Sequence, residues 1–321
     1  MNKLAMLAAV AAFSLPVACC LLPVAAMAQD APGTVKKDSY RFVIVPKVVH
    51  PWFDKVNEGA QQAAAALKAQ TGANVEIVYS APQSADVVQQ NQIIDSALAT
   101  RPDGLALDLL DPSGNRASLE EAQGQKIPLV LFDSVPPEGM TITHIGSDFC
   151  EQAKIAARRL VEVLGGEGEV AIMMGVPTAP NHSIRADCHR EVFKEHPGIK
   201  VVAEGIDNDS IEIAQQQAAA IMQANPNLKG WVASDAAGPI GIGQAIVEAG
   251  KQGKVTLVGL DNLPEMLDMI RNGVADSSSA SQPELQGYWS VMTLWAQATG
   301  APVPGYIDTG NAFLTKENVG N

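Results

Sequence analysis

Short apolar segments that end in an acidic residue recur at matching places in the two halves of the chain. Residues 127–133 read Ile-Pro-Leu-Val-Leu-Phe-Asp, and residues 255–261 read Val-Thr-Leu-Val-Gly-Leu-Asp. Residues 101–108 and 227–235 resemble each other in the same way. Amphipathic segments of helical length separate these strands, and such alternation favours parallel sheets covered by helices. The pattern predicts an α/β chain with two lobes of similar order, which suits its 321 residues.

Strands and helices are predicted to alternate through the first lobe, and the order then starts again. Strands of the first lobe are expected at residues 41–46, 74–79, 104–109 and 128–132, and its helices at 53–70, 86–99 and 116–125. Strands of the second lobe are expected at 170–174, 200–204, 230–233 and 255–260, and helices at 149–164, 184–195, 211–224, 239–248, 264–272 and 286–299. Because helices connect the strands, neighbouring strands should run parallel.

The composition excludes several classes of protein. Hydrophobic residues make up 47% of the chain and charged residues 18%, which allows a large core and excludes intrinsic disorder. A formal net charge of −13 would repel a phosphate backbone, so we expect no nucleic-acid partner. The sequence has no Gly-x-Ser-x-Gly turn, phosphate-binding loop or His-Glu-x-x-His helix, and its five histidines lack metal-ligand spacing. We therefore predict neither an enzyme nor a metal or cofactor site.

Residues 1–28 have the features of a bacterial secretory signal peptide. Lys3 precedes an apolar run over residues 4–24, and Ala26-Met27-Ala28 is a small-residue cleavage site. A membrane anchor is the alternative, but two prolines interrupt the apolar run. We expect cleavage after Ala28 and export to the periplasm.

The four cysteines fall into two pairs. Cys19 and Cys20 precede the expected cleavage site, and the use of either for a lipid anchor stays open. Cys150 and Cys188 remain afterwards, on predicted helices that flank the same strand. An oxidising compartment permits a bond between them, but their spacing does not show whether it forms.

The carboxylates at the strand ends are the main candidates for a binding site. They are Asp108, Asp133, Asp235 and Asp261. Ligands of open parallel sheets bind outside the carboxyl ends of the strands, so both lobes should present these groups to one shared cleft. A carboxylate accepts hydrogen bonds from two hydroxyl groups. Capping of the following helices is the alternative role.

Further candidates follow the first strand of each lobe. Lys47 lies at the first strand end, and Trp52 and Phe53 could form an apolar wall there or pack into the core. In the second lobe, Arg185 lies near the start of a helix for which Asn181 and Ser183 are candidate caps. Its guanidinium could donate to several hydroxyls, or form a surface salt bridge.

An ordered set of motifs resembles the periplasmic sugar-binding proteins of ABC importers, of the ribose/galactose/rhamnose type. The motifs are Val43-Ile44-Val45-Pro46-Lys47 with His50-Pro51-Trp52-Phe53, Asn57-Glu58-Gly59-Ala60, Arg101-Pro102-Asp103-Gly104, residues 127–133, Ile145-Gly146-Ser147-Asp148 and Val258-Gly259-Leu260-Asp261. The Pro46-Lys47 pair and residues 313–319 are most similar to the rhamnose and autoinducer-2 binding branch.

The resemblance implies a type I periplasmic binding protein, with two Rossmann-like lobes of parallel sheets hinged by three crossovers. These crossovers are expected near residues 142–146, 280–282 and 306–310. The N-terminal lobe would comprise 38–145 plus 282–308, and the C-terminal lobe 146–281 plus 309–321. Such lobes close on a ligand about the hinge.

The resemblance also implies ligand contacts. They are Lys47, Trp52, Asp108, Asp133, Asn181, Arg185, Ser234, Asp235 and Asp261, with Ser281 or Gln282 at the hinge. One departure is Ser134, where the ribose-binding pattern has an arginine. This departure favours a polyol, deoxysugar or branched sugar over ribose.

We therefore expect an exported, monomeric receptor that captures a monosaccharide-like ligand and delivers it to an ABC transporter permease. A periplasmic sensor that feeds a chemoreceptor or histidine kinase is the alternative. The signal peptide occupies the place of the DNA-binding helices of a repressor with this fold, which excludes that class. A glycosidase that uses two of the aspartates is disfavoured by the family resemblance.

Overall fold

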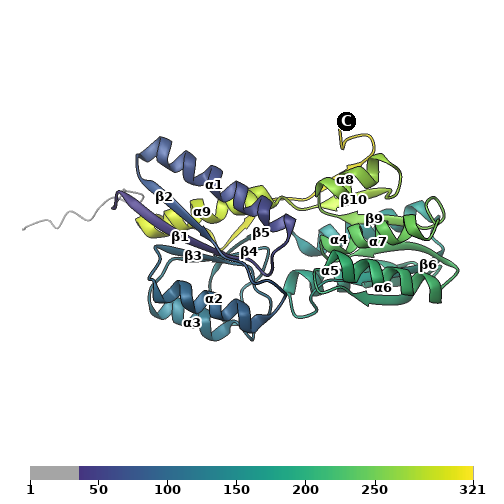
Figure 1. Ribbon diagram of the computed structural model, residues 1–321, viewed down its shortest axis with the longest axis horizontal. Coiled ribbons are helices and arrows are strands. Elements are labelled where there is room, and N and C mark those ends of the chain that lie inside the picture. The colour runs from purple at the N-terminus through teal and green to yellow at the C-terminus, as the bar shows by residue number, and fades with distance from the viewer. Residues whose placement is uncertain (1–35, 321) are drawn as a thin grey trace, which may run out of the picture. The chain divides into compact units, whose positions relative to one another are not determined.

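Two six-stranded sheets form the framework of residues 36–320 in the computed structural model (Figure 1). These residues belong to one unit, Pro32–Asn321. The strand order is β11-β5-β4-β3-β1-β2 in the first sheet and β12-β10-β9-β8-β6-β7 in the second. The predicted α/β class with two similar lobes is confirmed. The predicted signal peptide and both cysteines within it lie outside the described residues.

The first lobe consists of the first sheet and four helices. Its strands are β1 (Ser39–Val45), β2 (Asn74–Tyr79), β3 (Gly104–Leu107), β4 (Leu129–Phe132), β5 (Thr143–Gly146) and β11 (Tyr306–Asp308). Its helices are α1 (Pro51–Thr71), α2 (Val87–Ala99), α3 (Arg116–Gly124) and α9 (Pro283–Thr299). Helices α1 and α9 pack on one face of the sheet, and α2 and α3 pack on the other.

The second lobe repeats this arrangement. Its strands are β6 (Gly168–Met174), β7 (Ile199–Ile206), β8 (Leu228–Ala233), β9 (Thr256–Leu260), β10 (Ser277–Ala280) and β12 (Ala312–Thr315). Its helices are α4 (Phe149–Val163), α5 (Pro180–Glu195), α6 (Ile211–Ala224), α7 (Ala237–Glu248) and α8 (Pro264–Arg271). Helices α4 and α5 cover one face, and α6, α7 and α8 cover the other.

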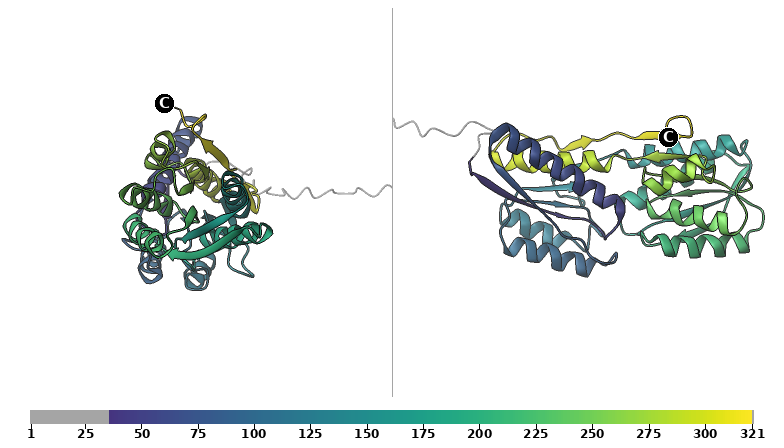
Figure 2. Two further views of the ribbon diagram at one scale, coloured as in Figure 1. Left: turned by 90° about the vertical axis from the view of Figure 1, so that its right-hand side faces the viewer. Right: turned by 45° about the horizontal axis from the view of Figure 1, so that its top comes forward.

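The chain passes between the lobes three times, between β5 and α4, between β10 and α9, and between β11 and β12 (Figure 2). The strand pairs are parallel except for β10 with β12, which is antiparallel. The prediction of parallel sheets is confirmed for the other pairs, and β10 with β12 is the exception. The chain comes from β11 of the first sheet and enters the second sheet at Ala312, opposite Ala280 at the end of β10, so β12 runs back along β10.

Prolines move two helix starts ahead of their predicted positions. Helix α1 begins at Pro51, where the His50 side chain accepts the Trp52 N–H, and ends at Gly72 in the left-handed region. Helix α5 begins at Pro180, and Ala179 is its N-cap residue without a side-chain bond. Proline suits the first helical position because its missing N–H would have no helical partner. Asn181 and Ser183 therefore lie inside α5, and their predicted capping role is wrong.

A disulfide joins Cys150 of α4 to Cys188 of α5, with 5.4 Å between the two Cα atoms. These helices pack side by side on one face of the second sheet. The bond, which the sequence left open, ties together two helices that carry side chains of the site described below.

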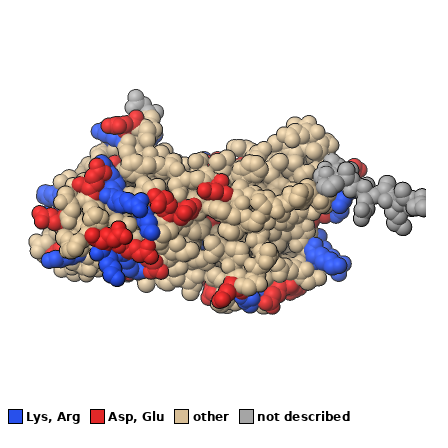
Figure 3. All heavy atoms as spheres, turned by 180° about the vertical axis from the view of Figure 1, so that it is seen from behind, with Lys and Arg blue, Asp and Glu red and all other residues tan. Residues whose placement is uncertain are grey.

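Charged side chains of both signs are mixed over the second lobe on the face in Figure 3. Ion pairs such as Arg190–Glu204 and Arg159–Asp276 lie on this lobe. This face has no basic stripe of the kind that follows a nucleic-acid backbone. Within the described residues, no helix combines the length and apolarity that a membrane span requires.

Candidate functional site

Side chains from both lobes converge on a small cavity at the carboxyl ends of the strands. Its volume is about 10 Å³, about what one water molecule needs. It is lined by Lys47, His50, Trp52, Phe53, Asp133, His182, Arg185, Asp209, Asp235, Ala236 and Asp261. Pockets for small organic ligands typically measure about 300 Å³ or more, so the walls must move apart before such a ligand can enter.

Asp133 and Asp261 occupy equivalent places in the two lobes. Each follows a buried strand, and each donates its main-chain N–H to the next strand, at Ile145 O and Ser279 O respectively. Both have positive φ, 44° for Asp133 and 64° for Asp261. Aspartate adopts this region more readily than most residues, and such strained backbone is typical of functional sites. The internal repeat that the sequence predicts thus extends to the local conformation of these residues.

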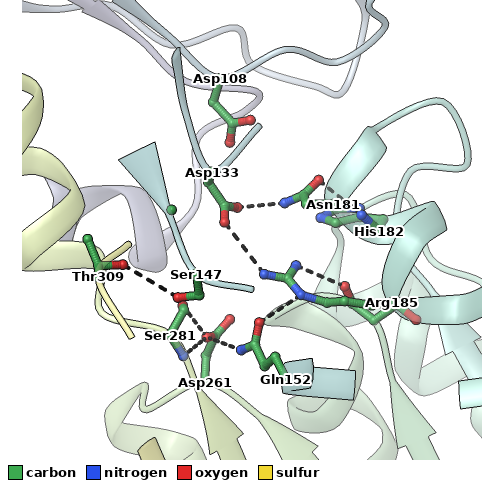
Figure 4. Close-up of polar contacts among 12 residues, drawn as sticks. Asp108, Asp133, Ser147, Gln152, Asn181, His182, Arg185, Asp261, Ser281 and Thr309 are labelled. Atoms are coloured by element: carbon green, nitrogen blue, oxygen red, sulfur yellow. Dashed lines mark hydrogen bonds and ion pairs between the residues drawn. The ribbon is translucent and has the colours of Figure 1, made fainter. Parts of the chain in front are cut away.

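Asp133 joins the lobes through its side chain (Figure 4). Its Oδ2 accepts a hydrogen bond from Asn181 Nδ2 at 2.6 Å, and its Oδ1 lies 3.5 Å from Arg185 Nη2. Lys47 Nζ lies 3.5 Å from Oδ2. A first-lobe carboxylate therefore accepts contacts from two side chains of α5.

Lys47 is buried beside Asp108 rather than exposed at the strand end. Its Nζ lies 2.8 Å from Asp108 Oδ2 and 3.3 Å from Asn181 Oδ1. Burial opposes the charge, but Asp108 and Asp133 raise the pKa of Lys47 above its usual value. Burial raises the pKa of Asp108, and Lys47 opposes that rise. Asp108 does not line the cavity and instead contacts Lys47.

Arg185 is held by contacts on several sides. Nε donates to Gln152 Oε1 at 2.9 Å, and Nη1 donates to the main-chain oxygen of Ser234 at 3.3 Å. The guanidinium lies 4.9 Å from the centre of the Phe149 ring. Its side chain is 2% exposed, so the alternative of a surface salt bridge is wrong.

Asp261 and the third interlobe connection meet at Ser281. Asp261 Oδ1 accepts from Ser281 N at 2.9 Å and from Ser281 Oγ at 2.5 Å. Of the two hinge residues that the resemblance offered, Ser281 reaches the site. Gln282 precedes α9, is half-buried and does not line the cavity.

Trp52 and Phe53 both line the cavity and belong to the core. Their rings meet edge to face at 5.1 Å, and Phe53 meets Phe132 in the same manner at 6.4 Å. Lys47 Nζ lies 5.6 Å from the centre of the Phe53 ring. The two roles considered from the sequence are therefore compatible, because Trp52 and Phe53 pack into the core and also form part of the cavity wall.

Two histidines at the cavity were not predicted. His50 Nδ1 accepts from Trp52 N at 3.2 Å, and His182 Nδ1 accepts from Val176 N at 2.8 Å. An Nδ1 that accepts leaves the proton on Nε2, so both rings are donors at Nε2. Burial lowers the pKa of His182 well below its usual value, which keeps the ring neutral. Their positions beside Trp52 and Asn181 in the sequence were the available signal.

A group of buried carboxylates occupies the second-lobe side of the site. Asp235 Oδ2 accepts from Ala237 N and Gly238 N at the start of α7, and Asp207 Oδ1 accepts from Asp209 N. Burial and the charge of Asp209 raise the pKa of Asp207 to about 8. Burial and Asp207 raise the pKa of Asp235. Ser234, also predicted as a contact, is buried and does not line the cavity.

Residues 41–302 match the family model described as a periplasmic binding protein domain. The D-apiose import binding protein of Actinobacillus succinogenes is 28% identical over 272 residues, which cover 84% of this chain and 82% of that protein. The D-allose-binding periplasmic protein of Escherichia coli is 27% identical over 250 residues, with 75% and 78% covered.

A solved structure agrees with these relatives. The solute-binding protein of an ABC transporter from Burkholderia graminis, in complex with D-arabinose, superposes with a TM-score of 0.82 at 28% identity, over 88% of this chain and 98% of that one. The match of the family model covers most of the chain. The chain therefore belongs to the periplasmic binding protein family, whose members bind substrates for ABC transporters without transforming them.

Proposed function

We propose that this protein captures a monosaccharide-like ligand in the interlobe cavity and delivers it, as a monomer, to an ABC transporter permease in the inner membrane. The observation that carries the proposal is the convergence of Asp133 and Asp261, at equivalent strand ends, with Arg185 on one cavity. Carboxylates accept from vicinal hydroxyls, and the planar guanidinium donates to hydroxyl oxygens. Trp52 and Phe53 supply the apolar wall that the C–H face of a sugar needs.

Opening and closing of the lobes would govern access. The proposed N-terminal lobe is 38–145 plus 282–308, and the proposed C-terminal lobe is 146–281 plus 309–321. The small volume of the cavity and the polar contacts across it, such as Asn181 to Asp133, describe a closed arrangement. A ligand that contacts both lobes would shift the equilibrium toward closure, and the closed form is the one a permease can recognise.

The ligand class is a sugar, deoxysugar or polyol. The relatives above are named for D-apiose and D-allose. The Pro46-Lys47 pair and residues 313–319 resemble the rhamnose and autoinducer-2 branch, and Ser134 argues against ribose. Export follows from the proposed cleavage after Ala28, and the Cys150–Cys188 bond suits an oxidising compartment.

Thermal unfolding of residues 29–321 with a ligand panel tests the proposal. The panel holds pentoses, hexoses, deoxysugars, polyols and autoinducer-2. A ligand at about 100 times its dissociation constant stabilises the folded state by about 2.7 kcal/mol, a clear upward shift in Tm. Stabilisation by one or a few related compounds is expected. Absence of any shift across the panel would contradict the proposal.

A further inference from the structure

Acidic side chains outnumber basic side chains in and around the cavity. Lys47 and Arg185 are the cationic side chains that line it. Six buried carboxylates lie in or beside it, namely Asp108, Asp133, Asp207, Asp209, Asp235 and Asp261. The two histidines add no charge in this arrangement because each accepts a main-chain N–H at Nδ1.

Both cations are engaged by the first lobe's carboxylates. Lys47 lies 2.8 Å from Asp108, and the charged contact of Arg185 is with Asp133 (Figure 4). Asp261 is satisfied differently, by Ser281 and by Gln152 Nε2 at 3.4 Å. The remaining carboxylates, those of Asp207, Asp209 and Asp235, have no Lys or Arg within 4.0 Å among the described residues.

Asp235 has acceptor capacity that the protein does not use. Its Oδ2 accepts two main-chain N–H groups, but its Oδ1 is buried without a hydrogen-bond partner in the described chain. Asp207 Oδ2 is also buried without a hydrogen-bond partner in the described chain. Asp235 is 1% exposed and lines the cavity together with Asp209. Burial of an ionised carboxylate is costly, so Asp207 and Asp235 retain protons in the ligand-free protein, and a cation that reaches Asp235 would replace its proton.

An independent observation on the first-lobe wall also points to a ligand. Trp52 is 3% exposed and His50 is 5% exposed, and both line the cavity. The Trp52 indole N–H and His50 Nε2 have no hydrogen-bond partner among the described residues. These two donors suit hydroxyl oxygens, whereas the second-lobe acceptors suit a cation.

We propose that the ligand is an amino sugar or an amino polyol, whose ammonium group binds between Asp209 and Asp235 while its hydroxyls contact the first-lobe wall. The inference rests on the proposed function and specifies its substrate class. An ammonium group supplies a positive charge among these acidic side chains and the N–H donors that Asp235 Oδ1 lacks. Burial then strengthens the ion pair, because closure excludes water from around the charges.

A metal ion fits these residues less well. Within residues 36–320, one set of three metal-ligating side chains has all its ligand atoms within 4.8 Å of one another, and that set is Cys150, Cys188 and Glu191. Its two sulfurs form the disulfide. Asp207, Asp209 and Asp235 form no such set, whereas an ammonium group needs only two of them.

Calorimetric titration with matched compounds tests the inference. The probes are D-glucosamine, D-galactosamine, D-mannosamine and 1-amino-1-deoxy-D-sorbitol, each beside its hydroxyl counterpart and its N-acetyl derivative, at about pH 6, where a free amine is protonated. We expect at least one amine to bind about tenfold or more tightly than its hydroxyl and N-acetyl counterparts. Asp235→Asn and, separately, the less buried Asp209→Asn should remove this preference.

Asp268→Asn is the matched control, because Asp268 pairs with Arg271 on the surface of α8. It should keep the preference for the amine. Equal or tighter binding of the hydroxyl compounds would overturn the amine inference and leave the proposed function standing. Preference for the amine that persists in both cavity variants would overturn the assigned residues. If no compound of any class binds the folded protein, both the inference and the proposed function fail.

Discussion

Asn181 of α5 donates a buried hydrogen bond of 2.6 Å to Asp133 at the end of β4, and this bond links the two lobes. The same carboxylate faces Arg185 and Lys47. Because these partners come from different lobes, Asp133 connects ligand binding to lobe closure. A change at this carboxylate should alter affinity more than it alters the folding of either lobe.

Asp133→Asn should therefore weaken binding of the tightest sugar from the panel by about 2 kcal/mol or more, roughly 30-fold. The amide keeps the shape of the side chain but cannot accept from both Asn181 and Arg185 as a charged group. Titration calorimetry measures the affinity, and circular dichroism measures the fold. Asp187→Asn, which removes an exposed carboxylate from α5, is the control and should bind normally. Unchanged affinity in Asp133→Asn would contradict the role given to Asp133.

The disulfide should stabilise the second lobe and hold the Arg185 contact. Cys150 and Cys188 are separated by 38 residues, and closure of a loop of that length is worth about 2–4 kcal/mol. Gln152, which accepts from Arg185, lies one helical half-turn beyond Cys150 on α4. A reductant should lower the Tm by several degrees and weaken ligand binding.

A double variant, Cys150→Ser with Cys188→Ser, supplies the control for the reductant. It should already have the lower Tm, and the reductant should change it no further. A wild-type Tm that does not respond to full reduction would contradict the stabilising role. Mass spectrometry after alkylation establishes that the bond has been reduced.

The repeated strand-to-aspartate pattern predicted the most about this molecule. It indicated both lobes, the order of most elements and the meeting of Asp133 with Asp261, because buried apolar strands and their termini are local signals. Strand β10 was not predicted, since Ser277–Ala280 has neither alternation nor β-branched residues. Its strand conformation comes from pairing with β9 and β12.

The site was harder to predict where a tertiary contact decides the role of a residue. His182 is placed by an N–H of Val176 on a different segment, and Ser281 rather than Gln282 faces Asp261. The sequence does not show which of two adjacent polar residues points toward the site, because this depends on the backbone direction at the hinge. The Asp207 carboxylate was likewise missed, because its burial depends on the packing of α6 and α7.

Asp207 should make the ligand-free protein less stable as the pH rises from about 6.5 to about 8. Its pKa is raised to about 8 in the folded state, whereas an unfolded aspartate titrates near about 4. Across this window the folded state holds a proton that the unfolded chain has lost, so stability falls by up to about 1.4 kcal/mol per pH unit. The lowered pKa values of His182 and His189 affect the stability only at pH values below this range.

Urea unfolding at a series of pH values measures this slope. Asp207→Asn should flatten it, and the exposed control Asp268→Asn should keep the wild-type slope. Identical slopes in the wild type and Asp207→Asn would show that Asp207 is ionised throughout and would contradict its raised pKa.

Close packing of α1 against α9 should make two glycines indispensable to the first lobe. A Cβ at Gly287 would overlap the main-chain oxygen of Val56, and a Cβ at Gly59 would overlap that of Glu284. Backbone atoms cannot move aside cheaply, so Gly287→Ala should destabilise the protein by about 1–3 kcal/mol or more.

Gly124→Ala on α3 is the matched control, because a Cβ there meets no atom within 4 Å. Alanine also favours a helix by about 1 kcal/mol over glycine, so the control should be neutral or stabilised. Urea unfolding that gives Gly287→Ala the same stability as Gly124→Ala would show that α1 and α9 can separate without cost, and that their contact does not fix the position of Trp52 at the start of α1.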